Sequence, residues 1–258
     1  MVKKSSDGKC RFYEGKHTYR VGKKKYLSVT QLVHKHFPPF EEKKIARWLS
    51  SLPFAKKQKK GVRYWLNEWK KNRETGTLIH EELEKLVNNP QEYTILKPVL
   101  HPRTVIAWEG FHKIHRAMDE PITIPEMLIY NEEFEIAGQI DCVITVNGEG
   151  IEREIILLDW KATKDISFEY KYSDEEEKYG TSDITMNMEN CNGNQYALQL
   201  STYAYLLELE GYKIKELIIG HINPKTNKFN PIKVPYLRYE AESMLNERLM
   251  NLPLEDLK

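Results

Sequence analysis

Cysteines and long apolar segments are scarce in this sequence, and each scarcity excludes a class of protein. The three cysteines, Cys10, Cys142 and Cys191, lie far apart and form no Cys-x-x-Cys pair. Such spacing is typical of free thiols in a reducing compartment. No apolar run approaches the roughly 20 residues that span a bilayer. The N-terminal Met-Val-Lys-Lys-Ser-Ser also lacks the apolar region of a signal peptide. We therefore expect an intracellular, soluble protein, in the cytoplasm or, for a viral protein, inside the host cell.

Acidic residues are scarce only in the first part of the chain. Residues 1–75 contain 21 Lys and Arg but 6 Asp and Glu, whereas residues 76–258 contain 18 and 32, so the net charge of +1 hides a strong asymmetry. Phosphate backbones attract a surface of the first kind and repel one of the second. We predict that residues 1–75 contact nucleic acid, chiefly through Lys56, Lys57, Lys59 and Lys60. The alternative is a solvated basic surface, or an arm that folds onto the acidic part.

Aromatic residues alternate with basic ones in the helix expected over residues 61–71. Tyr64, Trp65 and Trp69 lie there among lysines and arginines. Such rings can stack on unpaired nucleobases. Trp65 and Trp69 are also four residues apart, which is the spacing of neighbours on one helix face. Both interpretations stay open, with core packing favoured for the tryptophans.

Two segments rich in apolar and β-branched residues predict neighbouring strands. The first covers residues 137–146 and contains Asp141, and the second is the apolar run 155–158 that leads into Asp159. An Asn-Gly pair follows the first segment and is a strong turn signal, so the strands should form an antiparallel hairpin. A turn centred near Gly150 would place Asp141 opposite Asp159.

The side chains of this hairpin predict a cation site. Facing residues have Cβ atoms about 4.5–5.5 Å apart, and two carboxylates at that distance repel unless a cation lies between them. Oxygen ligands favour a hard ion such as Mg²⁺ or Mn²⁺. Lys161 points to the same face as Asp159, because residues i and i+2 of a strand share a face. The alternative is that Asp141 caps a turn while Asp159 and Lys161 form an ordinary ion pair.

Two predicted helices carry further polar residues. The helix over residues 77–87 places His80 beside its apolar face, where a lone histidine is usually a packing or surface residue. The helix over residues 193–210 makes Gln199 and Tyr203 neighbours one turn apart. Glu126 precedes the Asp141 strand, and we do not count it as a ligand.

The sequence contains four short motifs in a fixed order: Gly-Thr-Leu-Ile-His-Glu-Glu-Leu-Glu at 76–84, Gly-Gln-Ile-Asp at 138–141, Asp-Trp-Lys at 159–161 and Gln-Leu-Ser-Thr-Tyr at 199–203. Together they resemble the motifs of the RecB-like branch of the PD-(D/E)xK nuclease superfamily, which is related to lambda exonuclease. Each motif alone is weak, whereas the four in this order are specific for the branch. The resemblance does not account for the first 70 or so residues.

The resemblance implies a role for each matching residue. The metal ligands would be His80, Asp141, Asp159 and the backbone carbonyl of Trp160. Lys161 would act with the two aspartates in catalysis. Gln199 and Tyr203 would contact the substrate.

The expected fold class is α/β, with a mixed central sheet of about four or five strands flanked by helices, as in a restriction-endonuclease-like core. We expect two parts: a basic N-terminal extension over residues 1–75, with a small β-meander over 11–27 and short helices, and a nuclease core over 76–258. The polar stretch 165–192 should be a mobile, solvated loop suited to act as a lid.

The expected function is that of a metal-dependent DNA nuclease with one or two Mg²⁺ or Mn²⁺ ions. We expect an exonuclease acting on DNA ends or single strands in replication, repair or recombination. The alternatives are a structure-specific or RNA endonuclease, or a non-cleaving nucleic-acid-binding module of a larger assembly. No iron–sulfur cluster is expected, because it takes four cysteine ligands and the sequence has three. No membrane partner is expected.

Overall fold

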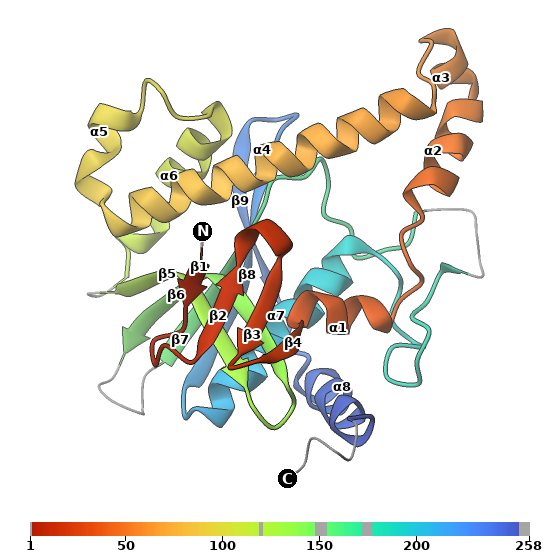
Figure 1. The fold of residues 1–258 in the computed structure, drawn as a ribbon. Helices are drawn as coiled ribbons and strands as arrows, with labels where there is room; N and C mark the ends of the chain where they lie inside the picture. Colours follow the sequence, from red (N-terminus) through yellow and green to blue (C-terminus); the bar gives the residue numbers. More distant parts are fainter. Residues whose placement is uncertain (1, 119–120, 148–153, 172–176, 253–258) are drawn as a thin grey trace.

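A mixed, nine-stranded sheet forms the centre of the computed structural model, which describes residues 2–118, 121–147, 154–171 and 177–252 (Figure 1). The strand order is β1-β2-β3-β4-β6-β7-β8-β9, and β5 pairs with β6 outside this path. The strands are β1 (Val2–Lys4), β2 (Cys10–Tyr13), β3 (Thr18–Val21), β4 (Lys24–Ser28), β5 (Ile122–Asn131), β6 (Ile136–Asn147), β7 (Glu154–Lys161), β8 (Lys213–Asn223) and β9 (Lys228–Val234).

The structure confirms the predicted α/β class, but its sheet has more strands than the four or five that we expect from the sequence. Strands β5 to β9 correspond to those expected core strands. The predicted meander forms β2, β3 and β4, and it joins the core because β4 pairs in parallel with β6. Phe12, Tyr19 and Tyr26 of the meander pack with Leu128 and Ala137 of the core strands. The N-terminal strands are therefore part of the central sheet.

Helices cover both faces of the sheet, since apolar side chains of each core strand alternate between them. In β7, Leu158 and Trp160 face one layer, formed with α4 and α6, whereas Ile155 and Leu157 face the other, formed with α1, α7 and α8. The helices are α1 (Val29–Lys35), α2 (Glu42–Ser51), α3 (Pro53–Lys57), α4 (Val62–Asn88), α5 (Tyr93–Leu96), α6 (Pro102–His115), α7 (Asn192–Leu209) and α8 (Arg238–Met250).

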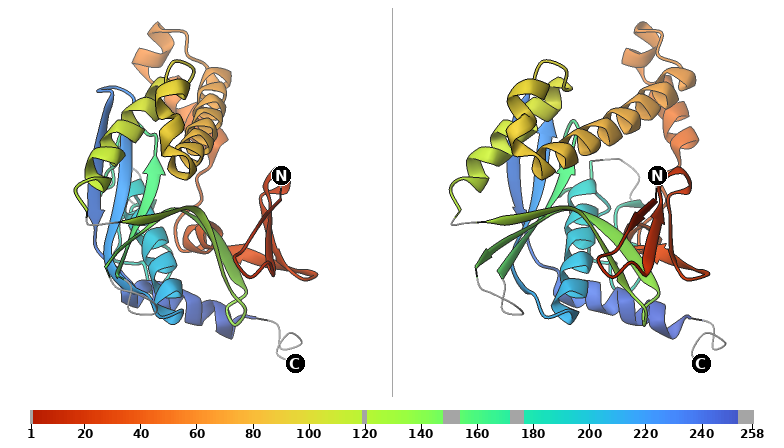
Figure 2. Two further views of the ribbon diagram at one scale, coloured as in Figure 1. Left: turned by 90° about the vertical axis from the view of Figure 1, so that its left-hand side faces the viewer. Right: turned by 60° about the vertical axis from the view of Figure 1, so that its left-hand side comes forward.

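Helix α4 differs from the sequence-based prediction. The helices expected over 61–71 and 77–87 are one continuous helix of 27 residues, and the expected boundary between residues 75 and 76 falls inside it. Gly76 in its middle costs about 1 kcal/mol relative to alanine, which neighbouring turns tolerate. One end of α4 packs on the sheet, and the other projects beyond it together with α2 and α3 (Figure 2).

Strand β6 changes its pairing partner along one edge, and the gap between the two partners leaves room for polar side chains. Along one edge, β6 pairs with β5 throughout. Along the other edge it pairs with β4 at Ile136 and Ala137, and with β7 only from Cys142 onward. The Gly-Gln-Ile-Asp segment at 138–141 lies between these two ladders, at the point where β4 and β7 diverge.

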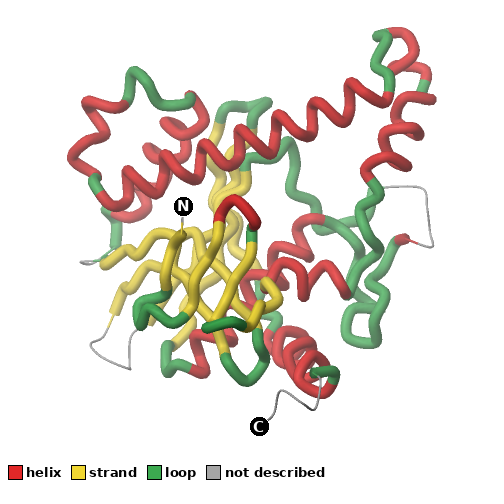
Figure 3. The backbone as a smooth tube through the Cα atoms, viewed as in Figure 1, coloured by secondary structure: helices red, strands yellow, loops and turns green. Residues whose placement is uncertain are grey.

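The segment 165–192, expected to be a mobile loop, is folded back onto the end of α1 and onto α2 in its described part (Figure 3). The backbone N–H of Thr181 donates to the carbonyl of His36 at 2.9 Å, and Ser182 Oγ lies 2.8 Å from His36 Nδ1. Lys44 Nζ of α2 lies 2.7 Å from a carboxylate oxygen of Glu177. Glu177 ends a run of four acidic residues, 174–177, whose first three members lie outside the described residues.

Candidate metal centre

Three carboxylates lie in a row across β5, β6 and β7. The β6–β7 ladder pairs Cys142 with Leu158 and keeps that register toward the turn as far as Thr145 and Ile155. One residue further from the turn, the same register places Asp141 opposite Asp159. This is the predicted hairpin register, although the turn itself lies outside the described residues. The backbone N–H of Trp160 donates to Asp141 Oδ2 at 2.7 Å and ties the two strands together at this point.

Glu126 occupies the corresponding position on β5. The β5–β6 ladder pairs Pro125 with Cys142 and Met127 with Ile140, which leaves Glu126 facing Asp141. Glu126 has a φ of +51°, a left-handed conformation that costs a non-glycine residue about 1–2 kcal/mol. Such strain is retained where the surrounding structure imposes it, often at functional sites.

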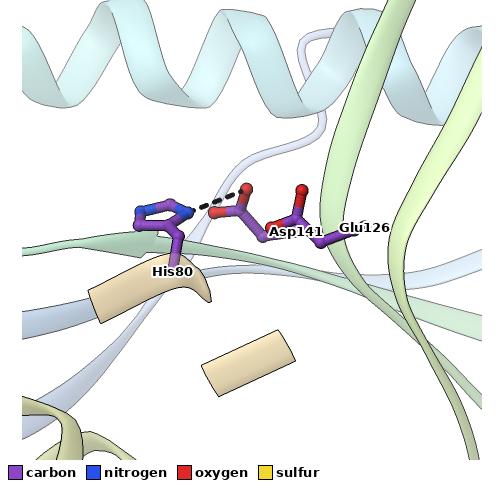
Figure 4. A group of neighbouring side chains, drawn as sticks. All are labelled: His80, Glu126 and Asp141. Atoms are coloured by element: carbon purple, nitrogen blue, oxygen red, sulfur yellow. Dashed lines mark ion pairs between the residues drawn. The ribbon is translucent and has the colours of Figure 1, made fainter. Parts of the chain in front are cut away.

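Helix α4 brings His80 to the same place, as the motif predicts. His80 Nδ1 lies 3.4 Å from Asp141 Oδ1, and Nε2 lies 3.1 Å from the carbonyl oxygen of Trp160. Figure 4 shows the imidazole pointing at the carboxylate of Asp141, with Glu126 beside it. The side chains of all three are partly buried.

The donor set of His80, Glu126 and Asp141 fits a divalent cation. One ligand atom from each lies within 4.8 Å of the others. Two ligands about 2.1 Å from one Mg²⁺ are at most about 4.2 Å apart, so shifts of a few tenths of an ångström would close the site. One nitrogen and two carboxylates also suit Mn²⁺. Glu126, which we did not count as a ligand, is thus a member of this group.

The structure places Asp159 beside the three-residue group and in contact with Lys161. Asp159 is 5% exposed, and its Oδ2 lies 2.5 Å from Lys161 Nζ. Among the described residues this ion pair is the only partner of Oδ2, which accepts no directed hydrogen bond. The Lys161 ammonium also lies 4.8 Å from the ring centroid of Tyr196 on α7. The ion pair that we weighed as the alternative is therefore present, and it adjoins the predicted cation site.

Burial and crowding shift the pKa values of these groups. Burial, reinforced by the charge of Asp141, raises the pKa of Glu126 to about 7. Burial also raises the pKa of Asp159 to about 6, although Lys161 opposes the shift. Burial disfavours a charged His80, but the Asp141 carboxylate outweighs burial and raises the pKa of His80 to about 9. Desolvation opposes ionisation of Asp141, yet His80 lowers its pKa overall. Clustered shifts of this kind are typical of functional sites.

Strand β1 contributes a cation that sequence patterns do not reveal. Lys3 Nζ lies 2.8 Å from Glu84 Oε2 and 3.5 Å from Glu126 Oε2. Lys3 thereby neutralises part of the negative charge around Glu126. This contact depends on the pairing of β1 with β2 at the sheet edge, for which the sequence offers no signal.

The two residues of the Gln-x-x-x-Tyr motif lie on α7 but have different surroundings. Tyr203 is buried against Gly138, where a Cβ would lie 2.4 Å from its ring carbon Cε1. The backbone of Gln139 hydrogen-bonds its hydroxyl, and burial raises its pKa well above the ordinary value. Tyr203 thus supports the strand that carries Asp141. Gln199 is half-buried one turn earlier, and its side chain forms no hydrogen bond with the ionisable groups of the site among the described residues.

The four predicted nucleic-acid-binding lysines lie far from this centre. Lys56 and Lys57 end α3, and Lys59 and Lys60 precede α4. From Val62, the first residue of α4, to His80 the helix axis rises about 27 Å. The lysines and the cation site are therefore at different places on the molecule, joined by one helix.

Comparison with known proteins does not identify the chain. Neither the models of protein families nor the curated proteins contain a match. A solved structure titled "Crystal structure of SSO0001" has 13% sequence identity and a TM-score of 0.28, covering 71% of this chain and 89% of that one. Within the described residues, no helix has both the length and the apolar character that crossing a membrane requires.

Proposed function

We propose that this protein is a metal-dependent nuclease that hydrolyses phosphodiester bonds of DNA, acting on ends or single strands. The observation that carries the proposal is the group of His80, Glu126 and Asp141 within 4.8 Å of one another, next to the buried pair of Asp159 and Lys161. Carboxylates and an imidazole can hold a metal ion that activates water, and a neighbouring lysine can stabilise the charge of a phosphate, so the group suits metal-assisted phosphodiester hydrolysis.

The cation site would take Mg²⁺ or Mn²⁺, held by His80, Glu126 and Asp141, with Asp159 and the Trp160 carbonyl close by. A bound ion would lower the pKa of a water molecule and screen the charge of the phosphate. The three strands hold the carboxylates before any ligand binds, so little reorganisation is needed.

Lys161 would stabilise negative charge on the phosphate and orient the attacking water. Contact with Asp159 and attraction to Asp141 outweigh burial and raise the pKa of Lys161 above its ordinary value, so it stays protonated at neutral pH. Its position between Asp159 and the Tyr196 ring restricts the ammonium to one place. A preorganised charge of this kind stabilises a transition state more than a mobile one does.

The proposal is tested with a supercoiled plasmid and an end-labelled linear oligonucleotide, each with Mg²⁺, Mn²⁺ or EDTA. Shortening of the linear strand while circles survive indicates an exonuclease. Nicked circles indicate an endonuclease, and cleavage of RNA in a parallel reaction would change the substrate class. DNA that is retarded in a gel but uncut with either metal would contradict the nuclease proposal and favour a binding module.

A further inference from the structure

The far end of α4 forms a basic tip with no acidic residue of its own. We use "arm tip" for residues 53–65, which comprise α3, the turn that follows and the start of α4 (upper right in Figure 1). The surrounding stretch 43–67 contains eight Lys and Arg and no Asp or Glu. The arm tip therefore has a concentrated positive charge in a chain whose net charge is only +1.

This positive charge is not neutralised within the described residues. No ion pair is formed there by Lys56, Lys57, Lys59 or Arg63, all of which are exposed. Lysines and arginines elsewhere on the arm do have partners: Lys44 pairs with Glu177, and Arg73 with Glu42. Uncompensated repulsion among neighbouring cations destabilises a folded protein, and an anionic ligand would remove it.

Aromatic rings are exposed among these cations. Phe54 is 46% exposed and Tyr64 is 37% exposed. Both pack edge-on against Trp65, with ring centroids 6.3 Å and 5.2 Å away. Lys60 Nζ lies 5.0 Å from the Tyr64 centroid. Trp65 lies behind the two outer rings and contacts both of them.

We infer that the arm tip is a binding site for unpaired nucleotides, remote from the cation site. The exposed rings offer stacking faces for bases, and the flanking lysines and Arg63 match the phosphates between them. A duplex has its base faces already stacked, so only a single strand can use both features. Anionic lipid would satisfy the charge but has no planar faces to stack, and an acidic protein does not alternate planar faces with phosphates along one strand as nucleic acid does. The inference rests on the proposed function only for the identity of the polymer.

The test measures binding by the full chain in EDTA, which prevents metal-dependent cleavage. A fluorescent 20-nucleotide single strand and the matched blunt duplex are titrated at several salt concentrations. Tyr64→Ala and Phe54→Ala should each weaken single-strand binding about fivefold or more and leave duplex binding nearly unchanged. Tyr64→Phe should retain wild-type affinity, because the stacking face remains. Tyr239→Ala removes a ring of α8 that is 75% exposed and should have no effect.

A second pair of variants separates charge from stacking. The double variant Lys56→Gln with Lys57→Gln should weaken the binding of both the single strand and the duplex, and it should reduce the salt dependence of binding. Equal loss for single strand and duplex in Tyr64→Ala, or no loss in either aromatic variant with an unchanged melting temperature, would overturn the inference. So would heparin or anionic phospholipid vesicles that bind as tightly as the single strand. Single-strand binding without any cleavage in Mn²⁺ would sink the nuclease proposal but leave this site standing.

Discussion

The Lys161 ammonium lies between the buried carboxylate of Asp159 and the ring of Tyr196, beside the three residues of the cation site. A lysine is costly to bury, and the structure keeps it charged by giving it these two partners. At the scale of single residues, the site thus separates two tasks. His80, Glu126 and Asp141 suit a cation, and in the proposed function Lys161 would contact the phosphate.

Replacing Lys161 should separate these two tasks experimentally. We expect Lys161→Ala to reduce cleavage about 100-fold or more while Mn²⁺ binding, measured by calorimetry, persists. Asp159 loses its partner in this variant and can take up a proton, because its pKa is already raised to about 6. Lys215→Ala, which removes an exposed lysine of β8 paired with Glu154, serves as the control. Wild-type cleavage by Lys161→Ala would contradict the assigned role.

Metal binding should depend on pH in a direction that the raised pKa values determine. Glu126, with a pKa of about 7, and His80, with a pKa of about 9, hold protons at pH 6 that a cation must displace. Mn²⁺ affinity should therefore rise as the pH increases from about 6 to 9, with protons released on binding. Calorimetry in two buffers of different ionisation enthalpy counts these protons. An affinity that falls over this range would show that the ligands are not these two groups.

At the scale of helices and strands, two glycines of the nuclease-like motifs, at positions 76 and 138, have different structural roles. Gly138 of β6 lies against the Tyr203 ring, where a Cβ would come within 2.4 Å of ring carbon Cε1. Gly76 of α4 has no heavy atom within 4 Å of an added Cβ. Close packing between β6 and α7 therefore needs a glycine at the first position, whereas the helix at the second would be more stable with alanine.

The two alanine variants should consequently shift stability in opposite directions. Gly138→Ala should lower the free energy of unfolding by about 1–3 kcal/mol, because the buried ring must move. Gly76→Ala should raise it by about 1 kcal/mol, because alanine favours the helix interior. Urea denaturation followed by circular dichroism measures both. A stabilising Gly138→Ala would show that Tyr203 does not pack on β6 as described.

At the scale of the whole molecule, α4 connects the arm tip to the cation site. Tyr64 precedes His80 by sixteen residues on this helix, a rise of about 24 Å. With stacked bases spaced about 3.4 Å apart, this rise equals about seven base steps, so a strand with stacked bases needs about eight nucleotides to contact both places. The helix therefore sets a minimum length for a substrate that uses the whole surface.

Cleavage should then depend on oligonucleotide length in a way that the arm tip controls. Above about eight nucleotides, kcat/KM should rise for the wild-type chain and rise less for Tyr64→Ala. Below that length the two proteins should cleave equally. A Tyr64→Ala defect that is already complete with the shortest substrates would indicate that the tip acts by another route. The measurement is a series of end-labelled single strands in Mn²⁺.

Much of the site was predictable because its signals are local. The hairpin register that faces Asp141 with Asp159 follows from an apolar run, a turn signal and the period of two in a strand. The position of His80 on a helix follows from the apolar pattern around it. The roles of the site residues, of Gln199 and of the four lysines all remain predictions, since the structure shows where these residues lie but not what they bind.

What the sequence by itself determined is therefore the α/β class, the strands that hold the aspartates and the basic character of the N-terminal part. Only the tertiary structure decided that Glu126 joins His80 and Asp141, that Lys3 approaches Glu126, and that α4 is one helix. The physical reason is the sequence distance over which each contact acts. Patterns of two and four residues report contacts within one element, whereas these features depend on a left-handed backbone residue, on pairing between distant strands and on packing along the whole of α4.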